Sequence, residues 1–85
     1  MNYTITSFPN LTLNERIDMV CNHGTYVAVR RYFNRLINLY VFEDTFYEVF
    51  MKLENDCIEK VEMLDDIKKL DFYIGYMVDL NEHEL

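Results

Sequence analysis

The stretch TYVAVRRYFNRLINLYVFEDTFYEVFMKLENDCIEKVEML, residues 25–64, decides the fold of this chain. It contains neither glycine nor proline, and it is crowded with β-branched and aromatic residues, which are enriched in strands. Short polar breaks at 34–35, 43–45 and 54–56 divide it into segments of strand length. The stretch therefore predicts four consecutive strands over residues 25–33, 36–43, 46–53 and 57–64.

Short connections between these strands predict an antiparallel meander, and alternation along each strand predicts its two faces. A one-residue slip in register would exchange the faces. The expected aliphatic face carries Val27, Val29, Ile37, Leu39, Val41, Val49, Met51 and Leu53. The expected aromatic face carries Tyr26, Arg30, Tyr32, Asn38, Tyr40, Phe42, Phe46, Glu48 and Phe50.

A helix is expected on each side of this meander. Before it, Thr12 and Glu15 match the capping box that begins a helix, and Gly24 is expected to end that helix in a left-handed conformation. The apolar positions of the first helix are Leu13, Ile17, Val20 and Cys21. A second helix is expected from 65–66, with an apolar stripe of Ile67, Leu70, Ile74 and Met77 or Val78.

The predicted fold class is α+β: a four-stranded antiparallel meander with one helix before it and one after it, both on the aliphatic face. The 85 residues are expected to form one domain. Residues 1–11 form an N-terminal arm that adds an edge strand or lies across the surface, and residues 81–85 form a frayed tail.

Charge is unevenly spread along this acidic chain, whose formal net charge is −7. Residues 1–42 contain four arginines and two acidic residues, whereas residues 43–85 contain four lysines and thirteen acidic residues. Arginine suits bidentate and stacked contacts better than lysine does. Arg30, Arg31 and Arg35 gather around the first predicted hairpin, beside several aromatic residues.

These observations favour a non-enzymatic protein-interaction module, because tyrosine and arginine often anchor interfaces. The partner would be another protein or a second copy of the chain, which would make a homodimer through the aromatic sheet face. The candidate partner-binding residues are Tyr26, Arg30, Tyr32, Tyr40, Phe42 and Phe50. The alternative for the hairpin is a solvated structure whose arginine stems cover aromatic rings.

A second functional hypothesis uses the acidic residues at 54–66. They could imitate a phosphate backbone and let the chain act as an acidic inhibitor of a basic site. The structural alternative is a charged edge strand followed by a favourably charged helix start. Nucleic-acid binding is disfavoured, because three arginines are few and an acidic chain repels phosphate.

Catalytic and metal-binding patterns are weak. Cys21 and His23 stand near a helix C-terminus, which would not stabilise a thiolate, and with Cys57 and His83 their spacing matches no compact zinc pattern. No cofactor or metal is expected, and the cysteines are expected to be reduced. No apolar run reaches the ~20 residues of a membrane helix, and no signal peptide is recognised, which predicts a cytoplasmic protein.

Several short motifs within about residues 13–74 resemble a group of small uncharacterised bacterial proteins. The motifs are Glu15-Arg16, Gly24-Thr25-Tyr26, Asn38-Leu39-Tyr40, Phe46-Tyr47-Glu48-Val49 and Leu70-Asp71-Phe72-Tyr73-Ile74. The resemblance implies a bacterial, soluble, stand-alone domain, and it implies no activity and no site residue.

Overall fold

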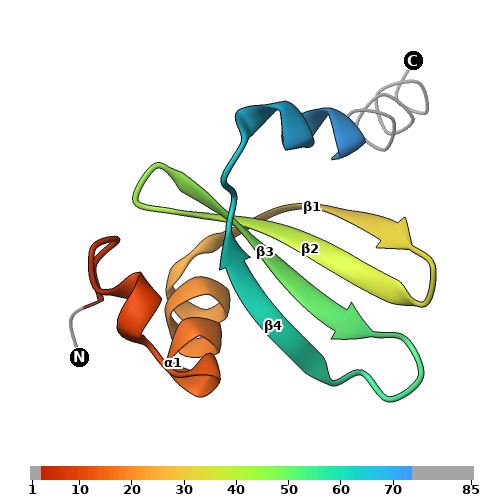
Figure 1. Cartoon of the computed structure of the whole chain (residues 1–85), viewed down its shortest axis with the longest axis horizontal. Helices are drawn as coiled ribbons and strands as arrows, with labels where there is room; N and C mark the ends of the chain where they lie inside the picture. The colour runs from red at the N-terminus through yellow and green to blue at the C-terminus, as the bar shows by residue number, and fades with distance from the viewer. Residues whose placement is uncertain (1–2, 74–85) are drawn as a thin grey trace.

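The computed structural model describes residues 3–73 and confirms the α+β meander. Four strands, β1 (Thr25–Tyr32), β2 (Arg35–Phe42), β3 (Thr45–Lys52) and β4 (Ile58–Met63), form one antiparallel sheet in the order β1-β2-β3-β4. Before it lie a 3-10 turn η1 (Phe8–Asn10), the helix α1 (Leu13–Ile17) and a π-helical turn η2 (Asp18–Asn22). After it comes a 3-10 turn η3 (Ile67–Leu70), and Figure 1 shows η3 well apart from α1.

The predicted face assignments are wrong, and the hairpin turns explain why. Phe33-Asn34 and Glu43-Asp44 are two-residue turns, so odd-numbered residues of one strand stand opposite even-numbered residues of the next. Ile37 therefore lies opposite Phe50, and Asn38 lies opposite Val49. A β-bulge between Tyr26 and Ala28 shifts the parity again within β1. Aliphatic and aromatic residues are consequently mixed on both faces.

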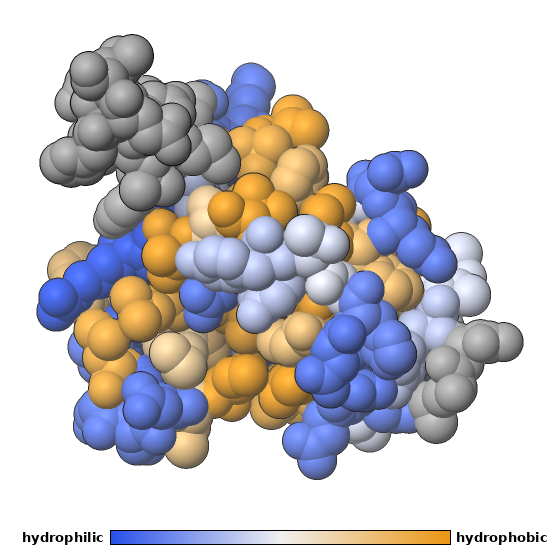
Figure 2. Space-filling model, turned by 180° about the vertical axis from the view of Figure 1, so that it is seen from behind, coloured by the Kyte–Doolittle hydropathy of each residue, from blue (hydrophilic) through white to orange (hydrophobic). Residues whose placement is uncertain are grey.

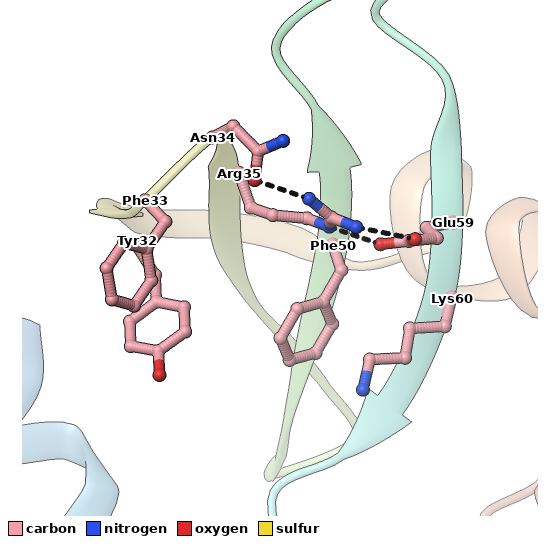
Figure 3. Close-up of a pocket in the computed structure, with 7 residues that line it drawn as sticks. All are labelled: Tyr32, Phe33, Asn34, Arg35, Phe50, Glu59 and Lys60. Carbon is pink, nitrogen blue, oxygen red and sulfur yellow. Dashed lines mark hydrogen bonds and ion pairs between the residues drawn. The ribbon is translucent and has the colours of Figure 1, made fainter.

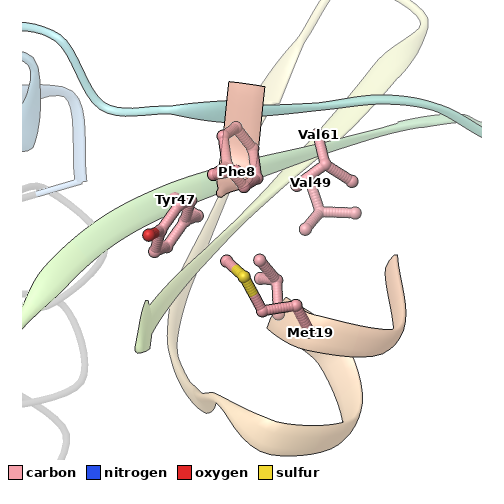
Figure 4. Packing of buried hydrophobic residues seen from close by; sticks show 6 residues of the cluster. Phe8, Met19, Tyr47, Val49 and Val61 are labelled. Atoms are coloured by element: carbon pink, nitrogen blue, oxygen red, sulfur yellow. The ribbon is translucent and has the colours of Figure 1, made fainter. Parts of the chain in front are cut away.

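Each face is covered by a different end of the chain, which corrects the prediction that both helices share one face. We call the two sides the α1 face and the η3 face. On the α1 face, Tyr47, Val49 and Val61 pack against Met19 and Val20 of η2 (Figure 4). On the η3 face, Ala28 and Leu39 pack against Tyr73, with Leu70 beside them. Because apolar residues occupy both faces, covering only one would leave the other in water.

The described part of the N-terminal arm, residues 3–11, lies across the α1 face and adds no strand. Phe8, in the 3-10 turn, is 4% exposed and joins the core, where its ring lies 5.0 Å from that of Tyr47. The Tyr3 hydroxyl donates a 2.8 Å hydrogen bond to Asp18, which ties the start of the described chain to the end of the helix. Pro9 follows Phe8 and fixes the backbone of the short turn.

The first helix begins as predicted but ends differently. The Thr12 side chain accepts a hydrogen bond from the Glu15 amide while the Glu15 side chain accepts one from the Thr12 amide, which confirms the capping box. Gly24 does not adopt a positive φ, contrary to the prediction. Glycine is needed there instead because the chain passes close to two other backbone segments. A Cβ at position 24 would lie 2.5 Å from the carbonyl oxygen of Val20 and 2.9 Å from that of Val41.

The segment after β4 agrees only in part with the predicted second helix. Asp66 caps η3 by accepting a hydrogen bond from the Lys68 amide. Leu70 packs inward, but Ile67 is 71% exposed and is no part of an inward stripe. The rest of that predicted stripe and the tail at 81–85 lie outside the described residues. No helix within residues 3–73 is long and apolar enough to cross a membrane.

Candidate functional site

The six predicted partner-binding residues do not share one face. Tyr26, Tyr40 and Phe42 belong to the α1 face. Arg30, Tyr32 and Phe50 belong to the η3 face. The proposed single aromatic surface is therefore wrong, and it is replaced by two separate groups.

The group on the α1 face is mostly part of the core. Tyr40 and Phe42 are half-buried and pack against the cluster around Met19. Tyr26 is 52% exposed and stands edge-on to Tyr40, with ring centres 5.6 Å apart. Because one exposed ring on its own is common on protein surfaces, this group forms no clear site.

The group on the η3 face surrounds a buried polar network. Glu48, on β3, is only 4% exposed. Its Oε2 accepts a 2.7 Å hydrogen bond from the Tyr73 hydroxyl and a 3.3 Å hydrogen bond from Nη2 of Arg30. Burial and the hydrogen bond to Glu48 raise the pKa of Tyr73 far above its ordinary value, so the hydroxyl remains a donor. The network joins β1, β3 and the segment after η3.

Arg30 also organises the rings around this network. Its guanidinium carbon lies 4.9 Å from the ring centre of Phe72, 5.5 Å from that of Tyr73 and 5.9 Å from that of Tyr32. Cation–π attraction at such distances is strongest where water is excluded, and the Arg30 side chain is 14% exposed. Arg30 therefore acts mainly as a hub that holds these rings in place.

Beside this hub, the η3 face is hollowed. Two adjoining hollows of about 490 and 480 Å³ share Tyr32 and Phe50, so we treat them as one surface, the docking trough. The docking trough is lined by Arg30, Arg31, Tyr32, Phe33, Asn34, Arg35, Ile37, Phe50, Glu59, Lys60 and Phe72. Its volume is within the range of ordinary ligand sites.

Figure 3 shows one half of the docking trough, with Phe50 between the β1–β2 turn and β4. Nζ of Lys60 lies 4.4 Å from the centre of the Phe50 ring. Nη2 of Arg35 donates a 2.9 Å hydrogen bond to Glu59, Nε donates to the other carboxylate oxygen, and Nη1 donates to Asn34. The hydrogen bonds between Arg35 and Glu59 lower the pKa of Glu59 and raise that of Arg35, so both stay charged.

Phe33 and Phe72 belong to the docking trough, but neither was among the six candidate partner-binding residues. Phe33 is 78% exposed and Phe72 is 57% exposed. Phe33 was placed at the end of a strand, whereas it occupies the first position of a two-residue turn with φ 55°. The separation of the two predicted strands by two residues is the signal that could have found it.

The left-handed backbone at Phe33 is unfavourable for a bulky residue, and glycine or asparagine would be expected there. The exposed ring contributes little to the core, although it packs edge-on against Tyr32 at 4.7 Å. Folding alone therefore gives no strong reason for a phenylalanine at this turn.

The acidic residues at 54–66 are partly used by the fold. Glu59 pairs with Arg35, Asp65 lies 2.7 Å from Nζ of Lys69, and Asp66 caps η3. Glu54, Asp56 and Glu62 are exposed. Half of the carboxylates that were considered for the mimic hypothesis therefore already have a structural partner.

Other chemistry-bearing residues do not converge. Cys21 and Cys57 are free thiols, and burial raises the pKa of Cys21, which makes it a poorer nucleophile. His23 lies near Asp18, 3.7 Å away, on an exposed part of the surface. Within residues 3–73, no group of three or more histidine, cysteine or acidic side chains is placed to hold a metal ion.

Apolar side chains nevertheless remain at the surface. Figure 2, which shows the molecule from behind, has a broad apolar area in the middle of the surface with hydrophilic residues around it.

Comparison of the chain with family models, curated proteins and solved structures finds no match. The resemblance to small bacterial proteins stays a prediction, and the function has to be inferred from the chemistry of the site.

Proposed function

We propose that the protein is a non-enzymatic interaction module that binds a partner protein in the docking trough. The observation that carries the proposal is the continuity of the two hollows across Tyr32 and Phe50, with two strongly exposed rings, Phe33 and Phe72, at the border. The docking trough is a part of the described η3 face that a partner can reach.

The composition of the docking trough supports binding. Aromatic and arginine side chains are the residues that most often dominate binding energy at interfaces. Here the network around Glu48 fixes Arg30, and Arg30 in turn holds Tyr32 and Phe72. Side chains that are already held in place lose little conformational entropy on binding. The side chains of the docking trough are therefore preorganised for binding.

The same composition gives little support for catalysis. Among residues 3–73, the lining contains no histidine, cysteine, serine or threonine. The one carboxylate of this described lining, Glu59, is held by Arg35. A nucleophile with an adjacent base, or a pair of free acid and base groups, is what general catalysis needs. A binding role fits these residues better than a reaction.

Site-specific photo-crosslinking tests this proposal. A benzoyl-phenylalanine placed at position 33 keeps the aromatic character of the exposed turn, and the matched control carries it at position 14, an exposed site on α1. When the two variants are expressed in the producing organism, we expect a discrete covalent adduct from position 33 and none of the same mass from position 14. The mass of the adduct tells whether the partner is a second 10.3 kDa chain or another protein.

A variant within the docking trough completes the design. Phe50→Ala in the position 33 background should remove the adduct, because Phe50 is shared by both hollows. Circular dichroism of that variant establishes that it is folded. Identical adducts from positions 33 and 14, or no adduct at position 33, would argue against docking at this surface.

A further inference from the structure

We infer that the occupant of the docking trough is a second copy of this chain, and that each copy inserts its Phe33 ring into the hollow around Phe50 of the other. This inference rests on the proposed function and names the partner. The observation that carries it is a projecting ring next to a hollow on one surface. Phe33 is 78% exposed, and it borders the hollow of about 480 Å³ that also contains Phe50.

The placement of the ring and the hollow suits a twofold symmetric dimer. In such a dimer the same patch of both copies meets itself, so the patch must carry both the inserted group and the site that accepts it. Figure 3 shows Phe33 at the β1–β2 turn and the hollow between this turn and β4. A twofold axis between the turn and the hollow would place each Phe33 over the hollow of the other copy.

The backbone of the turn gives a second reason to assign a role to Phe33. Its φ of 55° is unfavourable for a bulky side chain and would suit glycine. Unfavourable backbone conformations of this kind gather at functional sites, where another gain offsets their cost. Burial of the exposed ring in a second copy supplies such a gain.

The hollow around Phe50 suits an uncharged, apolar group. Arg35 and Glu59 hydrogen-bond to each other, so the charges of this pair are already matched. Nζ of Lys60 lies 4.4 Å from the centre of the Phe50 ring, and the apolar stem of a lysine can pack against an aromatic ring. An inserted phenylalanine would therefore meet the Phe50 ring and the Lys60 stem without leaving a charge unpaired.

The area that the rings can bury indicates a weak, reversible dimer. Tyr32 is 55% exposed and Phe33 is 78% exposed. Since an aromatic side chain can bury about 150–250 Å², the two rings would contribute roughly 500 Å² summed over both copies. Stable interfaces bury about 1,200–2,000 Å² in total, and smaller ones are typical of transient contacts. The dissociation constant of the dimer is accordingly expected to be on the order of tens of micromolar.

Sedimentation equilibrium of the purified full chain over a range of concentrations tests the inference. We expect a monomer–dimer equilibrium that changes little with salt, because the contact is mainly aromatic. Phe33→Gly should weaken the dimer roughly tenfold or more, since both copies lose their inserted ring. The variant should remain folded by circular dichroism, because glycine adopts a positive φ readily. Tyr26→Ala removes an exposed ring on the α1 face and should leave the dimer unchanged.

Photo-crosslinking of a mixture locates the contact between the copies. A chain with benzoyl-phenylalanine at position 33 is irradiated together with an isotope-labelled unmodified chain, so that attachments between copies are recognised by mass. We expect the labelled peptides that carry the attachment to contain Phe50 or Lys60. The same probe at position 14, on α1, should give no attachment to these peptides.

The outcomes separate this inference from the proposed function. A chain that stays monomeric at millimolar concentration, while position 33 captures a different protein in the producing organism, would overturn the second copy and leave the interaction module standing. No self-association together with no adduct of any kind from position 33 would count against both. Equal losses from Phe33→Gly and Tyr26→Ala, or attachments from position 33 mainly to α1 of the labelled chain, would overturn the mutual insertion of Phe33.

Discussion

Replacing Arg30 with methionine is expected to destabilise the protein by about 3–5 kcal/mol, since it leaves the Glu48 carboxylate buried without its cation. A small domain has only about 5–10 kcal/mol of stability, so the loss would approach unfolding. Tyr73 would still donate to Glu48, but a hydrogen bond from one neutral donor does not replace the positive charge of Arg30. Urea unfolding followed by circular dichroism measures the change.

Two variants control this prediction. Arg35→Met makes the same replacement at an exposed ion pair with Glu59, and it should cost far less. In the double variant Arg30→Met with Glu48→Gln, no buried charge is left unpaired, so the second substitution should restore part of the stability. If the two substitutions simply add, Arg30 and Glu48 do not act as the buried pair described here.

Replacing Gly24 with alanine is expected to destabilise the protein by about 2–3 kcal/mol. The new methyl group would lie 2.5 Å from the Val20 carbonyl oxygen and 2.9 Å from that of Val41, and both oxygens belong to the backbone of packed elements. The joint between η2 and β1 would have to open, which would disturb the contact of Val20 with the core. Thermal unfolding and urea unfolding report the loss.

The sign of the change in stability tests whether close packing against Val20 and Val41 is the reason for a glycine at position 24. Gly24 has no positive φ, so where space permits, an alanine would be tolerated or would stabilise the protein by reducing the freedom of the unfolded chain. Thr25→Ala, at the exposed neighbouring position, is the control and should have a small effect. A neutral or stabilising Gly24→Ala would show that the close approach to Val20 and Val41 is not maintained.

The strands and the capping box could be predicted because both depend on residues that are neighbours in the sequence. The pattern of residues 25–64 predicted four strands, and no predicted strand end differs from the observed one by more than one residue. The residues of neighbouring strands that share one face of the sheet could not be predicted in the same way. Each two-residue turn pairs odd with even positions, and a bulge at Val27 reverses the relation again.

The candidate site could likewise be predicted only in part from the sequence. Arg30, Tyr32 and Phe50 were singled out as aromatic or basic residues on strands, and they lie together in the docking trough. The network of Arg30, Glu48 and Tyr73 could not be predicted, because its members are 18 and 25 residues apart and only the three-dimensional fold brings them together. Phe72 was expected inside the second helix, where it lay outside the predicted apolar stripe.

Docking in the trough is tested most directly by comparing backbone amide spectra of the isotope-labelled chain with and without its partner protein. We expect the largest shifts at Tyr32, Phe33, Phe50 and Lys60, with residues of α1 nearly unchanged. Shifts concentrated at Tyr26 and along α1 would place the contact on the α1 face and contradict it.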